Sequence, residues 1–173
     1  MQNLNRIGAM KEKVLENILA TQDIVRLIEN KKDVVLPAFE IRYKQVFPWK
    51  KILGTQEEAK TFVGFDISLG GAINCAVKTY YLNIWVMSHE SLMPVDNKVG
   101  EMLSISDRGV RTDILADKLD YLLNGSTDMG FGKLEIVGSD VFRPAERFSG
   151  RNIQYIISCL LYTSPSPRDR SLS

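Results

Sequence analysis

Residues 76–88 read AVKTYYLNIWVMS, and this stretch decides the fold. Its side chains alternate between two faces with the two-residue period of a β-strand. One face is apolar and the other is mixed: the first carries Tyr80, Leu82, Ile84 and Val86, and the second carries Tyr81, Asn83, Trp85 and Met87. A long strand of this kind is typical of a sheet that helices cover on one side.

Shorter alternating segments on both sides of this strand complete a sheet. Val63, Phe65 and Ile67 alternate with polar or small residues, and Ser68–Gly71 then gives a hairpin signal. Alternation returns after the turn at Gly130–Gly132 and again after Gly150. We therefore expect a mostly antiparallel sheet built from residues 61–68, 74–88, 132–142 and 151–157.

Two segments have the periodicity of amphipathic helices, at residues 6–29 and 109–123. Thr21–Asp23 is a possible interruption of the first helix, and Asn124-Gly125 is a stop signal for the second. Prolines and glycines mark residues 34–60 and 89–107 as loops. The fold class is α+β, a single domain whose helices pack on one sheet face and bury Val14, Ile18, Val25, Leu115, Leu119 and Leu122.

The C-terminal stretch Cys159–Asp169, CLLYTSPSPRD, differs in kind from the rest of the chain. It resembles, at all eleven positions, the one-frame translation of a transposon-end sequencing adapter. The resemblance implies a single domain at residues 1–158 with a truncated C-terminus, an artefactual tail at 159–173 and a metagenomic source. We expect packing to end at Ser158, apart from an opportunistic extension of the last strand through the apolar run 160–162.

The amino-acid composition limits the functions that such a domain could have. The formal net charge is +1, and it falls to zero without Arg168, Asp169 and Arg170 of the tail. A chain with balanced charge lacks the excess of positive charge that is typical of proteins that bind nucleic acid or an anionic membrane. No apolar run reaches the roughly 18 residues that a membrane-spanning helix needs. With the tail set aside only Cys75 remains, so we expect no internal disulfide and a protein made in the cytosol.

Candidate reactive groups are few, and each of them could instead have an ordinary structural role. His89 is the single histidine, and Cys75 is its only potential nucleophilic partner. Asp113, Asp117 and Asp120 share a helix face and could hold a divalent ion, although a solvated helix face is the favoured interpretation. Gly130-Phe131-Gly132 lacks the remainder of a dinucleotide-binding loop. We expect no enzyme, no catalytic residue, no cofactor and no metal.

Six pieces in order carry a family resemblance: ILATQDIVRLI (18–28), VFPW (46–49), KTFVGFDI (60–67), YYLNIWVMSH (80–89), RTDILADKLDYLLNGS (111–126) and GFGKLEIVGSDVFRPAERFSGRNIQYII (130–157). Together they resemble small tail and connector proteins of long-tailed bacteriophages that infect Gram-positive bacteria. The resemblance implies a tail-terminator or head–tail joining subunit of the virion, assembled in the host cytoplasm. It also implies a self-associated ring, usually a hexamer, that contacts tail-tube and connector proteins.

A ring subunit needs contact residues, and four aromatic side chains are candidates. Phe47, Trp49, Trp85 and Phe148 would either anchor a subunit interface or fill the core of a single chain. Two other functions stay open at this point. One is a small bacterial binding or adaptor module of unknown partner, and the other is a small enzyme that uses Cys75 and His89.

Overall fold

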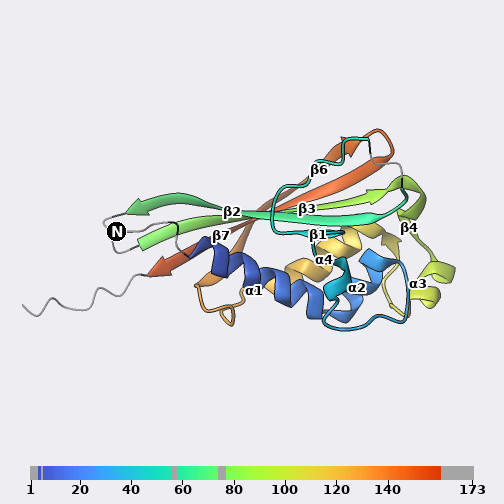
Figure 1. Cartoon of the computed structure of the whole chain (residues 1–173), viewed down its shortest axis with the longest axis horizontal. Coiled ribbons are helices and arrows are strands. Elements are labelled where there is room, and N and C mark those ends of the chain that lie inside the picture. Colours follow the sequence, from blue (N-terminus) through green and yellow to red (C-terminus); the bar gives the residue numbers. More distant parts are fainter. Residues whose placement is uncertain (1–3, 5, 56–57, 74–76, 161–173) are drawn as a thin grey trace, which may run out of the picture.

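The computed structural model describes residues 4, 6–55, 58–73 and 77–160, and it has the α+β architecture that the sequence predicts (Figure 1). The main sheet has the strand order β1-β2-β3-β7-β6. Short β1 runs parallel to β2, and the other neighbours are antiparallel. The strands are β1 (Val46–Phe47), β2 (Thr61–Ile73), β3 (Val77–His89), β6 (Lys133–Ala145) and β7 (Phe148–Leu160).

Strand β2 extends beyond the predicted end at residue 68, so the turn expected at Ser68–Gly71 is wrong. These residues continue the strand, and a β-bulge shifts the register between Leu69 and Gly71. Glycine inside a strand commonly marks a bulge or a close approach. Gly70 shows such an approach, because a Cβ atom there would lie 2.3 Å from the ring of Tyr81. The connection from β2 to β3 falls on residues 74–76, outside the described residues.

Three helices cover one face of the sheet: α1 (Ile7–Ala20), α2 (Gln22–Glu29) and α4 (Arg111–Leu123). The predicted interruption of the first helix is confirmed at Thr21, whose backbone is extended. A further helix, α3 (Asn97–Leu103), lies in the predicted loop 89–107. Asp96 caps it by accepting a hydrogen bond from the Val99 N–H at 2.9 Å. Smaller elements are two 3-10 helices, η1 (Phe39–Ile41) and η2 (Glu90–Leu92), and the two-stranded sheet of β4 (Pro94–Val95) and β5 (Gly109–Val110).

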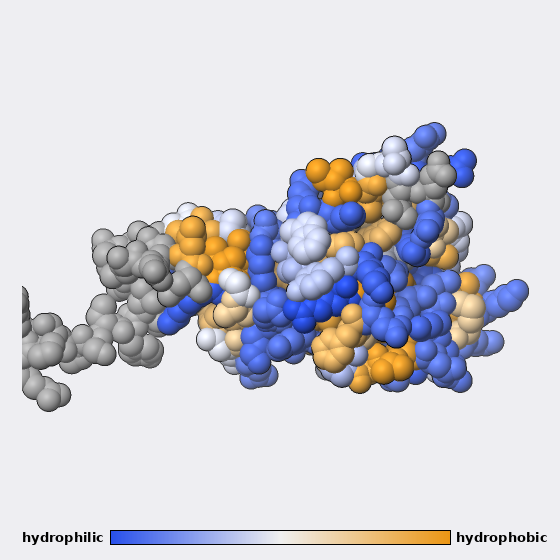
Figure 2. Space-filling model, in the orientation of Figure 1, coloured by the Kyte–Doolittle hydropathy of each residue, from blue (hydrophilic) through white to orange (hydrophobic). Residues whose placement is uncertain are grey.

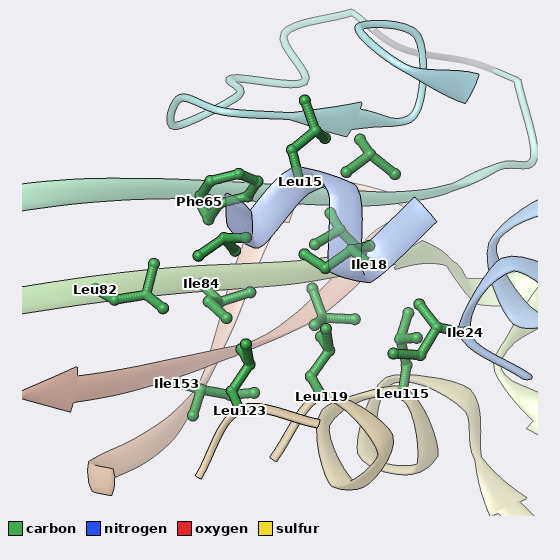
Figure 3. Packing of buried hydrophobic residues seen from close by; sticks show 14 of the residues in the cluster. Leu15, Ile18, Ile24, Phe65, Leu82, Ile84, Leu115, Leu119, Leu123 and Ile153 are labelled. Carbon is green, nitrogen blue, oxygen red and sulfur yellow. The ribbon is translucent and has the colours of Figure 1, made fainter. Parts of the chain in front are cut away.

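The main core lies between these helices and the sheet (Figure 3). Leucine and isoleucine side chains of α1, α2 and α4 face Phe65, Leu82, Ile84 and Ile153 of the strands. Five of the six predicted core residues are at most 1% exposed, namely Val14, Ile18, Val25, Leu115 and Leu119. The prediction for the sixth residue, Leu122, is wrong: Leu122 is only half-buried, and Leu123 is fully buried in its place. Leu123 continues the four-residue step from Leu115 through Leu119, whereas Leu122 lies at the margin of that stripe.

A smaller apolar cluster lies on the opposite face of the sheet. It contains Phe47, Leu53, Phe62, Met87 and Phe148. The segment that follows β1 crosses the sheet at Gly64, where a Cβ atom would come within 2.9 Å of the Trp49 carbonyl oxygen. This segment therefore covers one part of the second face.

The last strand continues past the predicted end of packing. Cys159 pairs with Lys78 in the ladder between β3 and β7, and its side chain is 4% exposed. Burial raises the pKa of the Cys159 thiol. The expectation that packing ends at Ser158 is therefore wrong for Cys159, while residues 161–173 lie outside the described residues.

Candidate functional site

The outermost strand β6 presents an open edge with exposed apolar side chains. It pairs with β7 on one side only and ends the strand order of the main sheet. Ile136, Val137 and Val141 are 44%, 54% and 70% exposed. Because an unpaired edge strand is a template for pairing with another chain, this edge is the first candidate for a contact surface.

Part of this edge is covered by the connection from α4 to β6. The Gly125 N–H donates to the Leu134 carbonyl at 2.7 Å, and the Ile136 N–H donates to Asn124 Oδ1 at 3.2 Å. Backbone groups of Leu134 and Ile136 therefore point away from β7.

A β-bulge at Val137 then inserts one extra residue between Ile136 and Gly138. In the alternating pattern of an antiparallel ladder, Ser139 and Val141 next direct their backbone groups away from β7. Within the described ranges, these groups have no hydrogen-bond partner on another segment. The edge is thus open from Ser139 onward.

A hollow of about 410 Å³ lies between α4 and this part of the sheet. Its apolar residues are Ala116, Ile136 and Ile153, and its polar residues are Asp113, Asp117, Asp120, Ser139 and Arg151. Apolar surface in a concave setting beside free backbone groups is suited to holding a segment of another protein.

The hollow is acidic. Arg151 Nε lies 2.7 Å from Asp113 Oδ1 and neutralises that carboxylate. The Tyr155 hydroxyl donates to Asp120 Oδ1 at 2.9 Å, and burial together with this hydrogen bond raises the pKa of Tyr155. Asp117 is exposed and has no ion pair or hydrogen bond with any described residue. The three carboxylates do not form a metal-ligand group in the described part of the chain.

The four predicted interface aromatics come together on the second face of the sheet. Phe47 and Trp49 have ring centroids 5.2 Å apart, and Trp85 packs against the small cluster that contains Phe47 and Phe148. Phe47 and Phe148 are 4% and 0% exposed, so they fill the core of the single chain. Trp49 is 44% exposed and Trp85 is half-buried, which leaves these two available to a partner.

The segment that carries Trp49 is both cationic and apolar at its surface. Lys50 Nζ lies 5.2 Å from the ring centroid of Trp85, and Lys51 Nζ lies 5.1 Å from that of Phe47. Ile52 follows with an exposure of 79%. Figure 2 shows one face of the molecule, on which hydrophobic patches are set in a mostly hydrophilic surface.

Arg111 has a structural role that the sequence pattern did not indicate. It opens α4, is 1% exposed, and donates to the carbonyl oxygens of Leu27 and Leu92 at 2.7 and 2.6 Å and to Asn30 Oδ1 at 2.7 Å. Burial lowers its pKa from its ordinary value to about 10. Arg111 therefore joins α4 to the end of α2 and to the segment before β4. Its only sequence signal is its place in the motif at residues 111–126.

Only one member of the alternative reactive pair, His89, lies within the described residues. His89 ends β3, where Nδ1 lies 2.7 Å from Ser91 Oγ and the ring meets Phe148 edge-on at 5.2 Å. Cys75 lies outside the described residues.

Among the helices that the structure describes, none is long and apolar enough to cross a membrane.

These observations define a small α+β protein that exposes apolar side chains on an open sheet edge and on a cationic segment, among other places. Residues 13–157 match the family model described as YomW, and the chain belongs to the YomW family. That family is named after a Bacillus phage-region gene product, which indicates a phage-associated protein. No curated protein matches the chain. The phage association expected from the sequence is supported at this level, and the narrower tail-terminator assignment stays a prediction.

Proposed function

We propose that this protein is a non-enzymatic structural subunit of a phage virion, a tail terminator or head–tail joining protein that works as a ring. The observation that carries the proposal is the open edge of β6 with its exposed apolar side chains. Membership of a phage-associated family and the ordered sequence pieces of the tail-protein resemblance support the same assignment.

An open edge favours association for a physical reason. Unpaired backbone groups and exposed valine and isoleucine side chains gain both hydrogen bonds and apolar burial when another chain covers them. A stable assembly needs an interface above about 1,000 Å² with well-packed apolar or aromatic residues at its centre. The β6 edge and the hollow beside it supply these elements on one side of the subunit.

The proposed partners are other copies of the chain, in a ring that we expect to be hexameric, together with tail-tube and connector proteins. Assembly would take place in the host cytoplasm and the product would reside in the virion. This role requires no cofactor, nucleic-acid site or membrane contact.

Native mass spectrometry and light scattering test the proposal on the full chain, alone and with the tail-tube protein of the same phage. We expect rings, and we expect Val141→Lys to abolish them because a charge on an open edge blocks pairing. Val35→Lys is the matched control, since Val35 is also highly exposed, at 82%, but lies far along the chain from β6. A protein that stays monomeric at all concentrations, with and without tail tube, would contradict the proposal and favour the adaptor alternative.

A further inference from the structure

We propose that the hollow between α4 and β6 of one copy receives the segment Trp49–Ile52 of a second copy. This inference rests on the proposed function and specifies which surfaces meet in the ring. The occupant is a cationic and apolar segment of the same chain, held by an acidic and apolar hollow.

The charges of the two surfaces are complementary. Arg151 neutralises Asp113, which leaves Asp117 and Asp120 as negative groups in the hollow. The segment contributes Lys50 and Lys51, and neither forms an ion pair with a carboxylate among the described residues. Opposite charges at matching surfaces steer association and fix the register of an interface.

The apolar groups are complementary as well. Ile136 and Ile153 line the hollow, and Val141 follows on the exposed edge beside it. On the segment, Ile52 is 79% exposed and Trp49 is 44% exposed. Burying an exposed side chain such as Ile52 removes apolar surface from water, which favours association.

The two surfaces lie toward opposite ends of the strand order of the same sheet. The segment lies against Gly64 of β2, next to β1, and β6 is at the other end of the strand order. A contact between different surfaces of identical chains is head-to-tail, and it closes into a ring when the rotation between copies allows it. This is the kind of contact that a ring requires.

A loop is a better occupant than strand β2 itself because the edge of β2 is protected. β1 pairs with β2 at Val63 and Gly64. Farther along the edge, the Ile67 N–H donates to its neighbour Asp66 at 2.8 Å, and Asp66 also binds Lys11 at 2.6 Å. Direct pairing between β2 and β6 of the next copy would have to break these contacts.

A charge swap on the full chain tests the contact. Lys50→Glu and Asp117→Lys should each weaken ring formation by about tenfold or more in dissociation constant at low salt. The double variant should restore it, because the same opposite charges then meet with their places exchanged. Lys98→Glu and Glu101→Lys, both exposed on α3, are the matched controls and should assemble like the wild type.

The outcomes separate this inference from the proposed function. Rings that form normally in both single variants would overturn the inference and leave the ring itself intact. Single variants that fail to assemble without rescue in the double variant would also overturn it, because the two surfaces would then meet other groups. Loss of tail-tube binding with intact rings would identify the tail tube as the occupant of the hollow. A wild type without rings would contradict the proposed function first.

Discussion

Replacing Arg111 with methionine removes a buried guanidinium while it keeps an unbranched side chain in the same space. Arg111 is 1% exposed and supplies a hydrogen bond to each of three acceptors, on Leu27, Asn30 and Leu92. In the variant these acceptors, one buried and two partly buried, lose their donor, which is more costly than removing both partners.

The magnitude follows from two opposing contributions. Hydrogen bonds to a charged group contribute about 1.5–3 kcal/mol each, so three of them contribute roughly 4–9 kcal/mol. Burial of the charge opposes this, since the lowering of the Arg111 pKa from its ordinary value to about 10 corresponds to about 3 kcal/mol. We therefore expect Arg111→Met to lower the free energy of unfolding by about 4 kcal/mol, within the range for breaking a buried charged arrangement.

Denaturant unfolding followed by circular dichroism measures this loss, and the exposed Arg147→Met is the control, with an expected change below about 0.5 kcal/mol. The difference between wild type and Arg111→Met should be constant from about pH 6 to 9, because the folded and unfolded pKa values of Arg111 both lie above that window. Above about pH 10 the unfolded chain binds more protons at this site, so wild-type stability should rise relative to the variant. A loss below about 1 kcal/mol at neutral pH would refute the role assigned to Arg111.

Three further predictions concern the two cores. Leu119→Ala should lower the free energy of unfolding by about 2–5 kcal/mol because Leu119 is fully buried, and a loss below about 1 kcal/mol in chemical denaturation would show that it is not. Gly64→Ala should displace the segment at Trp49, since the added Cβ atom would lie 2.9 Å from the Trp49 carbonyl oxygen; tryptophan fluorescence should report greater exposure than in Gly71→Ala, where the space is open. Tyr155→Phe should leave the tyrosinate absorbance change near pH 10 unaltered, because burial and the Asp120 hydrogen bond raise the pKa of Tyr155 above the ordinary value of about 10. A smaller change in the variant would contradict the raised pKa.

Periodicity predicted the main elements because most of them bury one face only. The alternation in residues 76–88 and the stripe through Leu115 and Leu119 gave β3 and α4 close to their observed bounds. The errors fall where local signals conflict with tertiary contacts. Ser68–Gly71 has turn composition, yet Gly70 is needed inside a strand because the ring of Tyr81 lies over it. Helix α3 is seven residues long and buries only Gly100 and Leu103, which is too little for a periodic signal.

The candidate site was less predictable than the fold. Sequence identified aromatic residues that could meet a partner, but only the structure separates buried Phe47 and Phe148 from exposed Trp49. The reason is that an aromatic residue has the same local pattern in a small second core and on an interface. The open edge of β6 also had no signal of its own, because strand order is a property of the folded chain and not of any one segment.

The bulge at Val137 explains why the outer edge of β6 is covered along its first part and open along the next. Without it, Ile136 and Gly138 would share a face, and Ser139 would turn to the other face. With one extra residue, Ile136 and Ser139 both line the hollow beside α4. Bulges also bend the strand that contains them, so the edge leaves the covered connection at Asn124 and Gly125 at this point. An edge that is open only beyond the bulge, opposite an edge protected by β1 and Asp66, favours one defined contact per copy over unlimited sheet extension.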